Sequence, residues 1–231
     1  MLKDFPRNVQ AQCTYGLDVI RLVVDNGVLY LHDIDTYGQP YRKPSPESLP
    51  RTRWLAYGSS ITEASSHGYI HEAARLLKID VLNKGMSGSC GLEESTARYL
   101  VDDCDWDFTT LEWGVNLRGR IEPDEFERRV NTALDLFVNT GRPVFVITVL
   151  PNHAHLRLGD PAVIARQNRF DEVLRDACTS RAQAHPNLSL IEGPDVLHEY
   201  SWLTADLIHP TRDGHARMGR CLADLLCKRL D

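Results

Sequence analysis

The sequence predicts an α/β protein in which a five-stranded parallel sheet lies between two layers of helices. Three observations support this three-layer α/β/α architecture. From residue 53 onward, short apolar runs alternate with segments of helical periodicity. The run 143–150, Pro-Val-Phe-Val-Ile-Thr-Val-Leu, is almost continuously apolar, as a strand covered on both faces requires. The 231 residues, 42% apolar and 25% charged, are also enough to enclose one full core.

The strands are expected at the short apolar runs, where aromatic and β-branched residues are frequent. Each run is too short for a helix that buries a full face. They are residues 54–57, 79–82, 108–113, 143–150 and 188–191.

The helices are expected where apolar residues recur every three or four positions. The segment 64–77 places Ile70, Ala73, Ala74 and Leu77 on one face, and 92–101 also has a helical pattern. The last three helices begin near prolines, which are common at the first helical position. Their start signals are Pro123-Asp124, Asp160-Pro161 and Pro210.

The first 50 residues predict an N-terminal arm ahead of the main domain, 51–231. Residues 17–34 suggest a β-hairpin, because two β-branched runs flank Asn26-Gly27, the strongest two-residue turn signal. Four prolines then favour an extended connector: Pro40, Pro44, Pro46 and Pro50. A lone hairpin is marginally stable, so it must dock on the main domain, on a partner chain or on something upstream. A homodimer through this arm is one candidate assembly.

Composition and charge disfavour several functional classes. The net charge of −6 repels phosphate backbones, so we expect no nucleic-acid partner. The N-terminus lacks the apolar stretch of a secretory signal, and no run approaches the roughly 20 apolar residues of a membrane span. A cytoplasmic location is therefore expected. The six cysteines lack metal-ligand spacing, and His67 and His71 lack the glutamate of a zincin motif, so we expect no metal.

Four loops combine residues that could perform chemistry, at the carboxyl ends of strands or just before a helix. Taken singly, each has a plain structural interpretation: a helix cap, a tight turn, an Asx turn and a surface loop. Together they supply a nucleophile, a backbone donor, an amide donor and an acid–base pair, which is the inventory for acyl transfer. The loops are Gly58-Ser59-Ser60, Gly85 to Gly91, Gly114-Val115-Asn116 and Asp206-Leu207-Ile208-His209.

In this order, the four segments resemble the Ser, Gly, Asn and His blocks of the SGNH, or GDSL, hydrolases. The resemblance covers roughly Trp54 to Arg229 and implies the flavodoxin-like SGNH-hydrolase fold. It is closest to a bacterial branch of GDSL-like lipases and acylhydrolases whose members often carry an N-terminal β domain. The hairpin at 17–34 would be a shortened form of that domain.

The resemblance also implies a serine esterase with defined roles and no cofactor. Ser60 would attack the carbonyl of a small-molecule ester. His209 would take the serine proton, and Asp206 would orient His209. The backbone N–H groups of Ser60 and Gly88, with the side-chain amide of Asn116, would form the oxyanion hole.

Two positions depart from the family pattern, and both concern substrate preference rather than the triad. Ser59 stands where the family usually has Asp, and Leu117 stands where many members have Asp. We expect Trp113, Leu117, His153 and Trp202 to line the substrate pocket. Because the sequence shows no cationic cluster near the site, we expect an uncharged or weakly polar short-chain acyl group.

Two other functions stay open at this point. The acyl-enzyme could pass its acyl group to an alcohol other than water, which would make the protein an acyltransferase. Alternatively, the chain could be a catalytically silent module that binds a carbohydrate or a metabolite. Labelling of Ser60 by a fluorophosphonate separates the second alternative from both enzymes.

Overall fold

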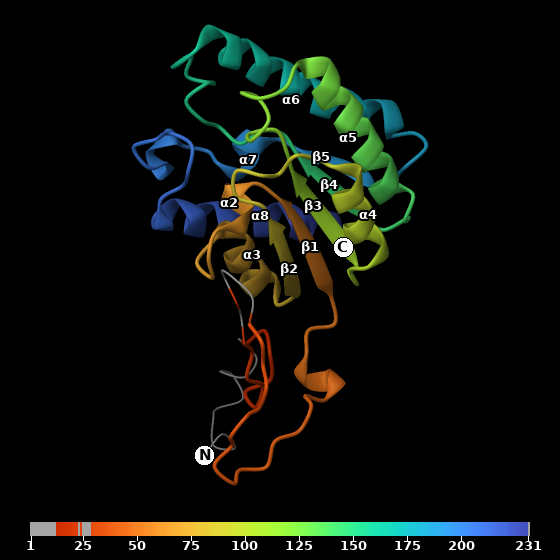
Figure 1. The fold of residues 1–231 in the computed structure, drawn as a ribbon, viewed down its shortest axis with the longest axis vertical. Coiled ribbons are helices and arrows are strands. Elements are labelled where there is room, and N and C mark those ends of the chain that lie inside the picture. Colours follow the sequence, from red (N-terminus) through yellow and green to blue (C-terminus); the bar gives the residue numbers. More distant parts are fainter. Residues whose placement is uncertain (1–12, 23, 25–28, 231) are drawn as a thin grey trace.

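The computed structural model describes residues 13–22, 24 and 29–230, and it contains the predicted five-stranded parallel sheet (Figure 1). The strand order is β2-β1-β3-β4-β5, and every neighbouring pair is parallel. This is the flavodoxin-like order, whose switch point lies between β1 and β3. The strands are β1 (Arg53–Gly58), β2 (Asp80–Gly85), β3 (Phe108–Glu112), β4 (Val144–Ile147) and β5 (Leu188–Ile191).

Helices cover both faces of the sheet, as predicted (Figure 1). One face packs against α4 (Glu94–Asp102), α5 (Pro123–Val138) and α6 (Pro161–Arg181). The other face packs against α3 (Tyr69–Leu77) and α8 (Arg212–Leu230). Short helical turns complete the described part of the chain: η2 (Pro46–Ser48), α2 (Ser60–Glu63), α7 (Gly193–Val196) and η3 (Tyr200–Trp202). In these described residues, no helix combines the length and apolarity needed to cross a bilayer.

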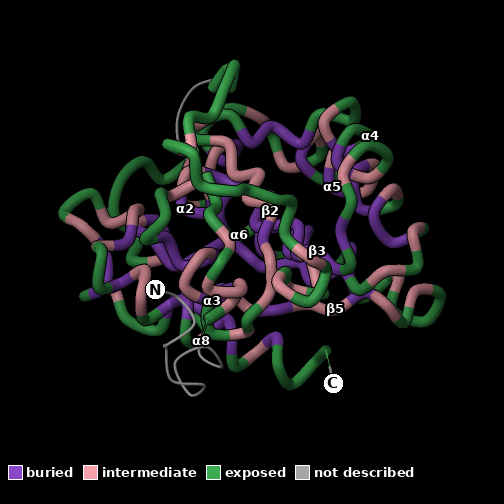
Figure 2. Tube along the Cα trace, turned by 90° about the horizontal axis from the view of Figure 1, so that it is seen from below, coloured by how far each residue is buried: buried purple, intermediate pink, exposed green. Residues whose placement is uncertain are grey.

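The alternation of side chains along β1 shows how the sheet serves two cores. Leu55 and Tyr57 belong to the core under α4, α5 and α6, whereas Trp54 and Ala56 belong to the core under α3 and α8. All four are fully buried, and buried residues concentrate along the sheet (Figure 2). A strand buried on both faces carries mostly apolar residues at successive positions. This explains why the strand sequences do not alternate between apolar and polar residues.

The helix expected at 64–77 is wrong in its first five residues. The structure has helix α3 from Tyr69 to Leu77, and Ala64 to Gly68 link it to the preceding short helix α2. This linker, Ala-Ser-Ser-His-Gly, is rich in residues that favour turns over helix interiors. A Cβ on Gly68 would lie 2.7 Å from the carbonyl oxygen of Ala64, so the tight turn requires glycine. The break leaves Ser60 at the start of its own short helix.

The N-terminal arm differs from the expected hairpin. Asn26-Gly27 lies outside the described residues, and residues 17–22, 24 and 29–34 contain no strand. Seven large apolar side chains of these residues are at least 46% exposed, so no apolar face of the arm is covered in the way that a stable ribbon needs. These side chains are Ile20, Leu22, Val24, Leu29, Tyr30, Leu31 and Ile34. Figure 1 shows the arm extending away from the α/β body.

Candidate active site

Ser60 is positioned by the tight connection between β1 and α2. Ser59 caps α2, because its Oγ accepts a hydrogen bond from the backbone N–H of Ile61 at 3.2 Å. Gly58 ends the strand where a Cβ would lie 2.4 Å from Thr62 Oγ1. The chain therefore turns sharply at Gly58 and presents Ser60 at the carboxyl end of the sheet.

A buried carboxylate, Glu112, lies beneath this connection. Its Oε2 accepts hydrogen bonds from the backbone N–H of Ser59 at 2.8 Å, from Ser59 Oγ at 2.6 Å and from Thr62 Oγ1 at 3.1 Å. Burial raises the pKa of Glu112, and the bonds from Ser59 and Thr62 oppose that shift. Sequence reasoning missed this residue, although a charged residue that ends an otherwise buried strand is a usable signal. Ser59, where the SGNH pattern has Asp, acts here as the donor to this carboxylate.

Ser60, His209 and Asp206 form a continuous hydrogen-bonded relay. Ser60 Oγ lies 2.9 Å from His209 Nε2, and His209 Nδ1 lies 2.7 Å from Asp206 Oδ2. Because a carboxylate can only accept, Nδ1 carries the proton and Nε2 is the acceptor for the serine hydroxyl. The structure thus brings together the three residues that the sequence predicts for the triad.

Asp206 is held as an anion by its own loop. Its Oδ1 accepts hydrogen bonds from Thr204 Oγ1, Ile208 N and His209 N at 2.8, 2.8 and 2.9 Å. Burial pushes the pKa of Asp206 upward, but the bonds from His209, Ile208 and Thr204 outweigh burial and hold the pKa far below its ordinary value. The carboxylate can therefore stabilise a positive charge on His209.

The loop that carries Asp206 and His209 is closed on itself. Leu203 and Pro210 form an antiparallel bridge, and Thr204 N–H donates to the carbonyl of His209 at 2.8 Å. The carbonyl of Leu207 accepts from the backbone N–H of His153 at 2.8 Å, which ties the loop to the segment after β4.

The predicted oxyanion residues stand opposite the relay. Gly88 has a φ of +64°, a left-handed conformation that favours glycine. Its loop is held by Arg120, which donates to the Gly88 carbonyl at 2.8 Å, and by Glu63, which accepts from Ser87 N–H. Asn116 uses its Oδ1 to accept from Cys90 N–H at 3.3 Å, which leaves its amide N–H groups as donors. The backbone N–H groups of Met86, Ser87, Ser89 and Cys90 donate to acceptors within the protein, so Gly88 N–H and the Asn116 amide are the groups here that can donate to a ligand.

Ser60, His209 and the oxyanion residues line a common cavity of about 220 Å³. Asp206 lies behind His209 and does not line it. The cavity is small, which suits a substrate group of a few heavy atoms. The lining residues are Ser60, Ser87, Gly88, Val115, Asn116, Arg118, Ile208 and His209.

The predicted pocket walls are placed differently. Trp113 and Leu117 are 0% and 4% exposed and belong to the core under α4, α5 and α6. Trp113 packs against Tyr57 and Phe137, because its strand end turns it toward that core. Trp202 stacks on His198 and lines a separate hollow beside α8. None of the three lines the cavity at Ser60, and apolar character alone did not distinguish a pocket wall from a core residue.

An arginine, Arg118, lines the cavity instead. Arg118 is only 5% exposed and is a lining residue together with Ser60 and His209. It donates to Gln167 Oε1 at 2.8 Å and to His153 Nε2 at 3.0 Å, so His153 lies behind Arg118 rather than in the cavity wall. The sequence led us to expect no cationic cluster near the site, and the structure places this single arginine there. An arginine two residues after Asn116 gave no sequence signal, because arginine in a loop is usually exposed.

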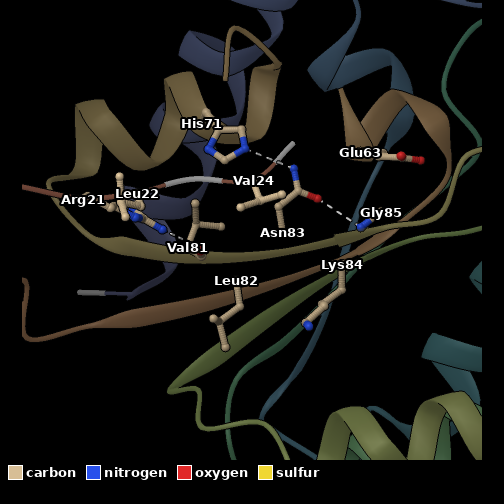
Figure 3. A pocket seen from close by; sticks show the side chains of 10 residues that line it. All are labelled: Arg21, Leu22, Val24, Glu63, His71, Val81, Leu82, Asn83, Lys84 and Gly85. Atoms are coloured by element: carbon tan, nitrogen blue, oxygen red, sulfur yellow. Dashed lines mark hydrogen bonds between the residues drawn. The ribbon is translucent and has the colours of Figure 1, made fainter. Parts of the chain in front are cut away.

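A second cavity, of about 340 Å³, lies between the arm and the edge strand β2 (Figure 3). Its polar groups bond to one another: Asn83 donates to Thr62 O at 2.7 Å, accepts from Gly85 N at 3.0 Å and lies 3.4 Å from His71 Nε2. It contains no residue of the triad. Across the described part of the chain, no group of three or more His, Cys, Asp or Glu side chains is arranged to hold a metal ion.

Comparison with known proteins gives a fold and no sequence relative. No protein-family model matches the chain, and no curated protein matches it by sequence. Solved structures do match, among them a protein described as a GDSL-like lipase from Bacteroides ovatus. It has a TM-score of 0.67 and 22% identity, and the match covers 79% of this chain and 55% of that one. The chain has the GDSL-type α/β fold.

Two further structures share this GDSL-type fold. A salicylyl-acyltransferase from a tetracycline biosynthetic pathway has a TM-score of 0.63 and 15% identity, with 77% of this chain and 55% of that chain covered. An acetyl xylan esterase variant from Geobacillus stearothermophilus has a TM-score of 0.59 and 20% identity, with 76% and 94% covered. The chain spans about half the length of the Bacteroides protein and of the acyltransferase.

Proposed function

We propose that the protein is a serine esterase that cleaves a small carboxylic ester through an acyl-enzyme on Ser60. One observation carries this proposal: the hydrogen-bonded relay from Ser60 through His209 to Asp206 ends in a small cavity lined by Gly88 and Asn116. The GDSL-type fold supports it, because the similar structures include a protein described as a lipase and an acetyl xylan esterase.

The geometry supports a two-step reaction. Ser60 Oγ attacks the ester carbonyl while His209 Nε2 takes the hydroxyl proton, and Asp206 stabilises the resulting imidazolium. The carbonyl oxygen becomes an oxyanion that accepts from the N–H groups of Ser60 and Gly88 and from the Asn116 amide. As the intermediate collapses, His209 gives the proton to the leaving alkoxide. Water then attacks the acyl-enzyme, with His209 again as base, and releases the acid and free Ser60.

The acyltransferase is the second candidate, because one structure with the same fold is a salicylyl-acyltransferase. The two activities share the acyl-enzyme and differ in the molecule that attacks it. Product analysis in the presence of added alcohols distinguishes them, since a hydrolase releases only free acid and a transferase forms a new ester.

The deciding experiment measures hydrolysis of p-nitrophenyl acetate, butyrate and octanoate. We expect wild-type activity that is highest on the short esters, because the cavity measures only about 220 Å³. Ser60→Ala and His209→Ala should each lower kcat by at least about 1,000-fold. Ser66→Ala, at an exposed serine in the linker after α2, is the matched control and should be unaffected.

Labelling provides a readout that does not depend on the ester chosen. A fluorophosphonate should modify Ser60 in the wild type and leave His209→Ala unmodified, as mass spectrometry of the peptide would show. A folded wild type that neither reacts with the probe nor hydrolyses any of the three esters would reject the esterase and favour the binding module.

A further inference from the structure

Arg118 is a buried cation that forms no ion pair with any of the described residues, although the buried carboxylate of Asp171 acts on it electrostatically. Arg118 lines the same cavity as Ser60 and His209, although the residue is only 5% exposed. Burying a charge is costly unless a partner of opposite charge or a full set of hydrogen bonds compensates it. Burial accordingly lowers the pKa of Arg118. Burying the Arg118 charge beside the proposed reaction site costs free energy, so a functional reason for its position is expected.

Both hydrogen-bond partners of Arg118 are neutral. Gln167 accepts through its amide oxygen at 2.8 Å. His153 Nδ1 lies 2.8 Å from the carbonyl oxygen of Leu158, so Nδ1 must carry the proton and Nε2 accepts from Arg118 as part of a neutral ring. These two bonds use two of the roughly five N–H donors that a guanidinium carries. They fix its position and leave its charge uncompensated at short range.

The carboxylate that acts electrostatically on Arg118 is that of Asp171, and its oxygens already bond to other groups. Asp171 Oδ1 accepts from Val149 N at 2.9 Å, and its Oδ2 accepts from Gln167 Nε2 and lies 3.1 Å from His155 Nε2. Among the ion pairs of the described residues, Asp171 is paired with His155, and none includes Arg118. Asp171 therefore acts on Arg118 only at longer range, through Gln167.

We propose that the substrate is an ester that carries a carboxylate, and that Arg118 is the residue that binds this carboxylate and sets the specificity. The inference rests on the proposed esterase function and names the substrate class of the same site. A guanidinium binds a carboxylate through two parallel N–H···O bonds, and the burial of Arg118 limits the access of water that would compete for them. Because the cavity is about 220 Å³, the carboxylate lies within a few bonds of the ester carbonyl.

The test compares charged esters with neutral esters of the same shape. Monoethyl succinate carries the carboxylate on the acyl side, and ethyl 4-methylpentanoate replaces that carboxylate by an isopropyl group. Acetoxyacetate carries it on the alcohol side, and isobutyl acetate is its neutral counterpart. We expect the wild type to prefer the charged ester of at least one pair by about ten- to a hundredfold in kcat/KM, measured by proton release. The pair that shows the preference identifies the side of the ester that faces Arg118.

Substitution of Arg118 assigns the preference to this residue. Arg118→Gln should reduce the charged-to-neutral ratio by at least about tenfold, and Arg118→Lys, which keeps the charge but loses the planar fork, should retain part of it. Arg98→Gln is the matched control, because Arg98 is exposed on α4 and pairs only with Glu94. It should leave the ratio unchanged.

The outcomes separate this proposal from the proposed function. Ser60-dependent hydrolysis of neutral esters, with both charged esters no faster, would overturn the role of Arg118 and leave the esterase intact. If no ester is hydrolysed, the proposed esterase function is rejected. Calorimetric titration of folded Ser60→Ala protein with monoethyl succinate and acetoxyacetate then tests the anion site at Arg118 by itself. Binding that Arg118→Gln weakens at least about tenfold supports the anion site, and absence of binding overturns it.

Discussion

Asn116 and Glu112 show two ways in which a polar side chain prepares Ser60 for reaction. Asn116 points its amide oxygen at Cys90 N–H and so keeps its N–H groups for the oxyanion. Glu112 gathers three donors from the loop that carries the nucleophile. The first acts on the reacting atoms and the second on the backbone that positions them, so their substitution should affect different measurements.

Replacing Asn116 should affect catalysis more than folding. Asn116→Ala removes one of the three proposed oxyanion donors, and losing such a donor typically costs about 3 kcal/mol in the transition state, or about 100-fold in kcat. The measurement is kcat on p-nitrophenyl acetate, together with the urea midpoint. Asn168→Ala, at an exposed position of α6, is the control. An unchanged kcat for Asn116→Ala would remove this side chain from the oxyanion hole.

Replacing Glu112 should affect stability first. Glu112→Leu leaves Ser59 N–H and two hydroxyl groups without their acceptor, so we expect a loss of at least about 3 kcal/mol in the free energy of unfolding. Glu112→Gln keeps an acceptor oxygen and should lose less. Urea unfolding of both variants checks this order, and a reversed order would show that the carboxylate is not the acceptor that matters.

His215 predicts a pH dependence of stability. Burial, and to a smaller degree the neighbouring His209, lower the pKa of His215 to about 4, while its Nδ1 accepts from Tyr69 N–H at 3.2 Å. The unfolded chain, with an ordinary histidine pKa of about 6.5, then binds the proton more readily than the folded chain. The contribution is fully present above about pH 6.5 and is lost as the pH falls toward 4, by about 2 kcal/mol between pH 7 and pH 5.

Urea unfolding at pH 7 and pH 5 measures this contribution. His215→Asn keeps an acceptor for Tyr69 N–H and cannot take up a proton, so its stability should fall less between the two pH values. An equal fall in wild type and variant would assign the acid sensitivity to other groups.

For individual residues, the sequence could predict the three side chains that the structure brings into one hydrogen-bonded chain, and it could not predict the residues that support them. Ser60, His209 and Asp206 lie in motifs whose spacing reflects their chemistry. Arg118 and Glu112 are important here because they are buried, and burial depends on the packing of distant segments: Gln167 is 49 positions from Arg118. The same ignorance of packing placed Trp113 in the pocket when it lies in the core.

Among the contacts between elements, the close approach of α2 to β2 leaves no space for a side chain at Gly85. A Cβ on Gly85 would lie 2.1 Å from the backbone nitrogen of Glu63, the last residue of α2. Backbone cannot yield as a flexible side chain can, so the helix that begins at Ser60 would have to move away from the sheet.

Gly85→Ala should therefore lower both stability and activity, with a loss of about 2 kcal/mol or more in the free energy of unfolding. Gly119→Ala is a matched control, because no atom lies within 4 Å of a Cβ built there and its φ is not left-handed. Thermal unfolding and kcat on p-nitrophenyl acetate provide the readouts. Normal activity in Gly85→Ala would mean that the position of α2 is set by other contacts.

The elements themselves could largely be predicted from apolar patterning, because a sheet covered on both faces leaves continuous apolar strands. The exceptions have local causes. The segment 64–77 has helical periodicity, yet its serines and Gly68 form a turn. The segment 17–34 has good β propensity, but the large apolar side chains of its described residues are exposed. No packing of these described residues against the rest of the protein therefore stabilises a two-stranded ribbon there.

For the whole molecule, polar contacts join the described residues of the arm to the edge strand β2, among them a hydrogen bond from Arg21 to the Val81 carbonyl at 3.4 Å. Tyr15 Oη donates to Asp80 at 2.6 Å, and Arg21 pairs with the same carboxylate at 3.1 Å. Partly exposed ion pairs contribute little to stability. We predict that the chain from Arg51 onward folds alone and keeps its esterase activity within about twofold. The boundary is tested by measuring cooperative unfolding and kcat of this truncated chain. If the truncated chain does not fold, the arm is part of the folding unit of the domain.

The exposed apolar side chains of the arm are a candidate surface for association between copies of the chain. We expect the full chain to form a homodimer and the chain from Arg51 to be a monomer, as sedimentation velocity would show. A dimer that survives truncation would place the contact on the α/β body.

The two hydrogen bonds that link Ser60, His209 and Asp206 join residues at very different separations along the sequence. Asp206 and His209 are three positions apart in a self-closed loop, whereas Ser60 and His209 are 149 positions apart. During synthesis, the nucleophile is made early, but it stays chemically idle until the last fifth of the chain has emerged and α8 has packed against α3. In a refolding experiment, activity should therefore recover only when Ser60 and His209 come into contact. We expect this recovery to be slower than the appearance of secondary structure.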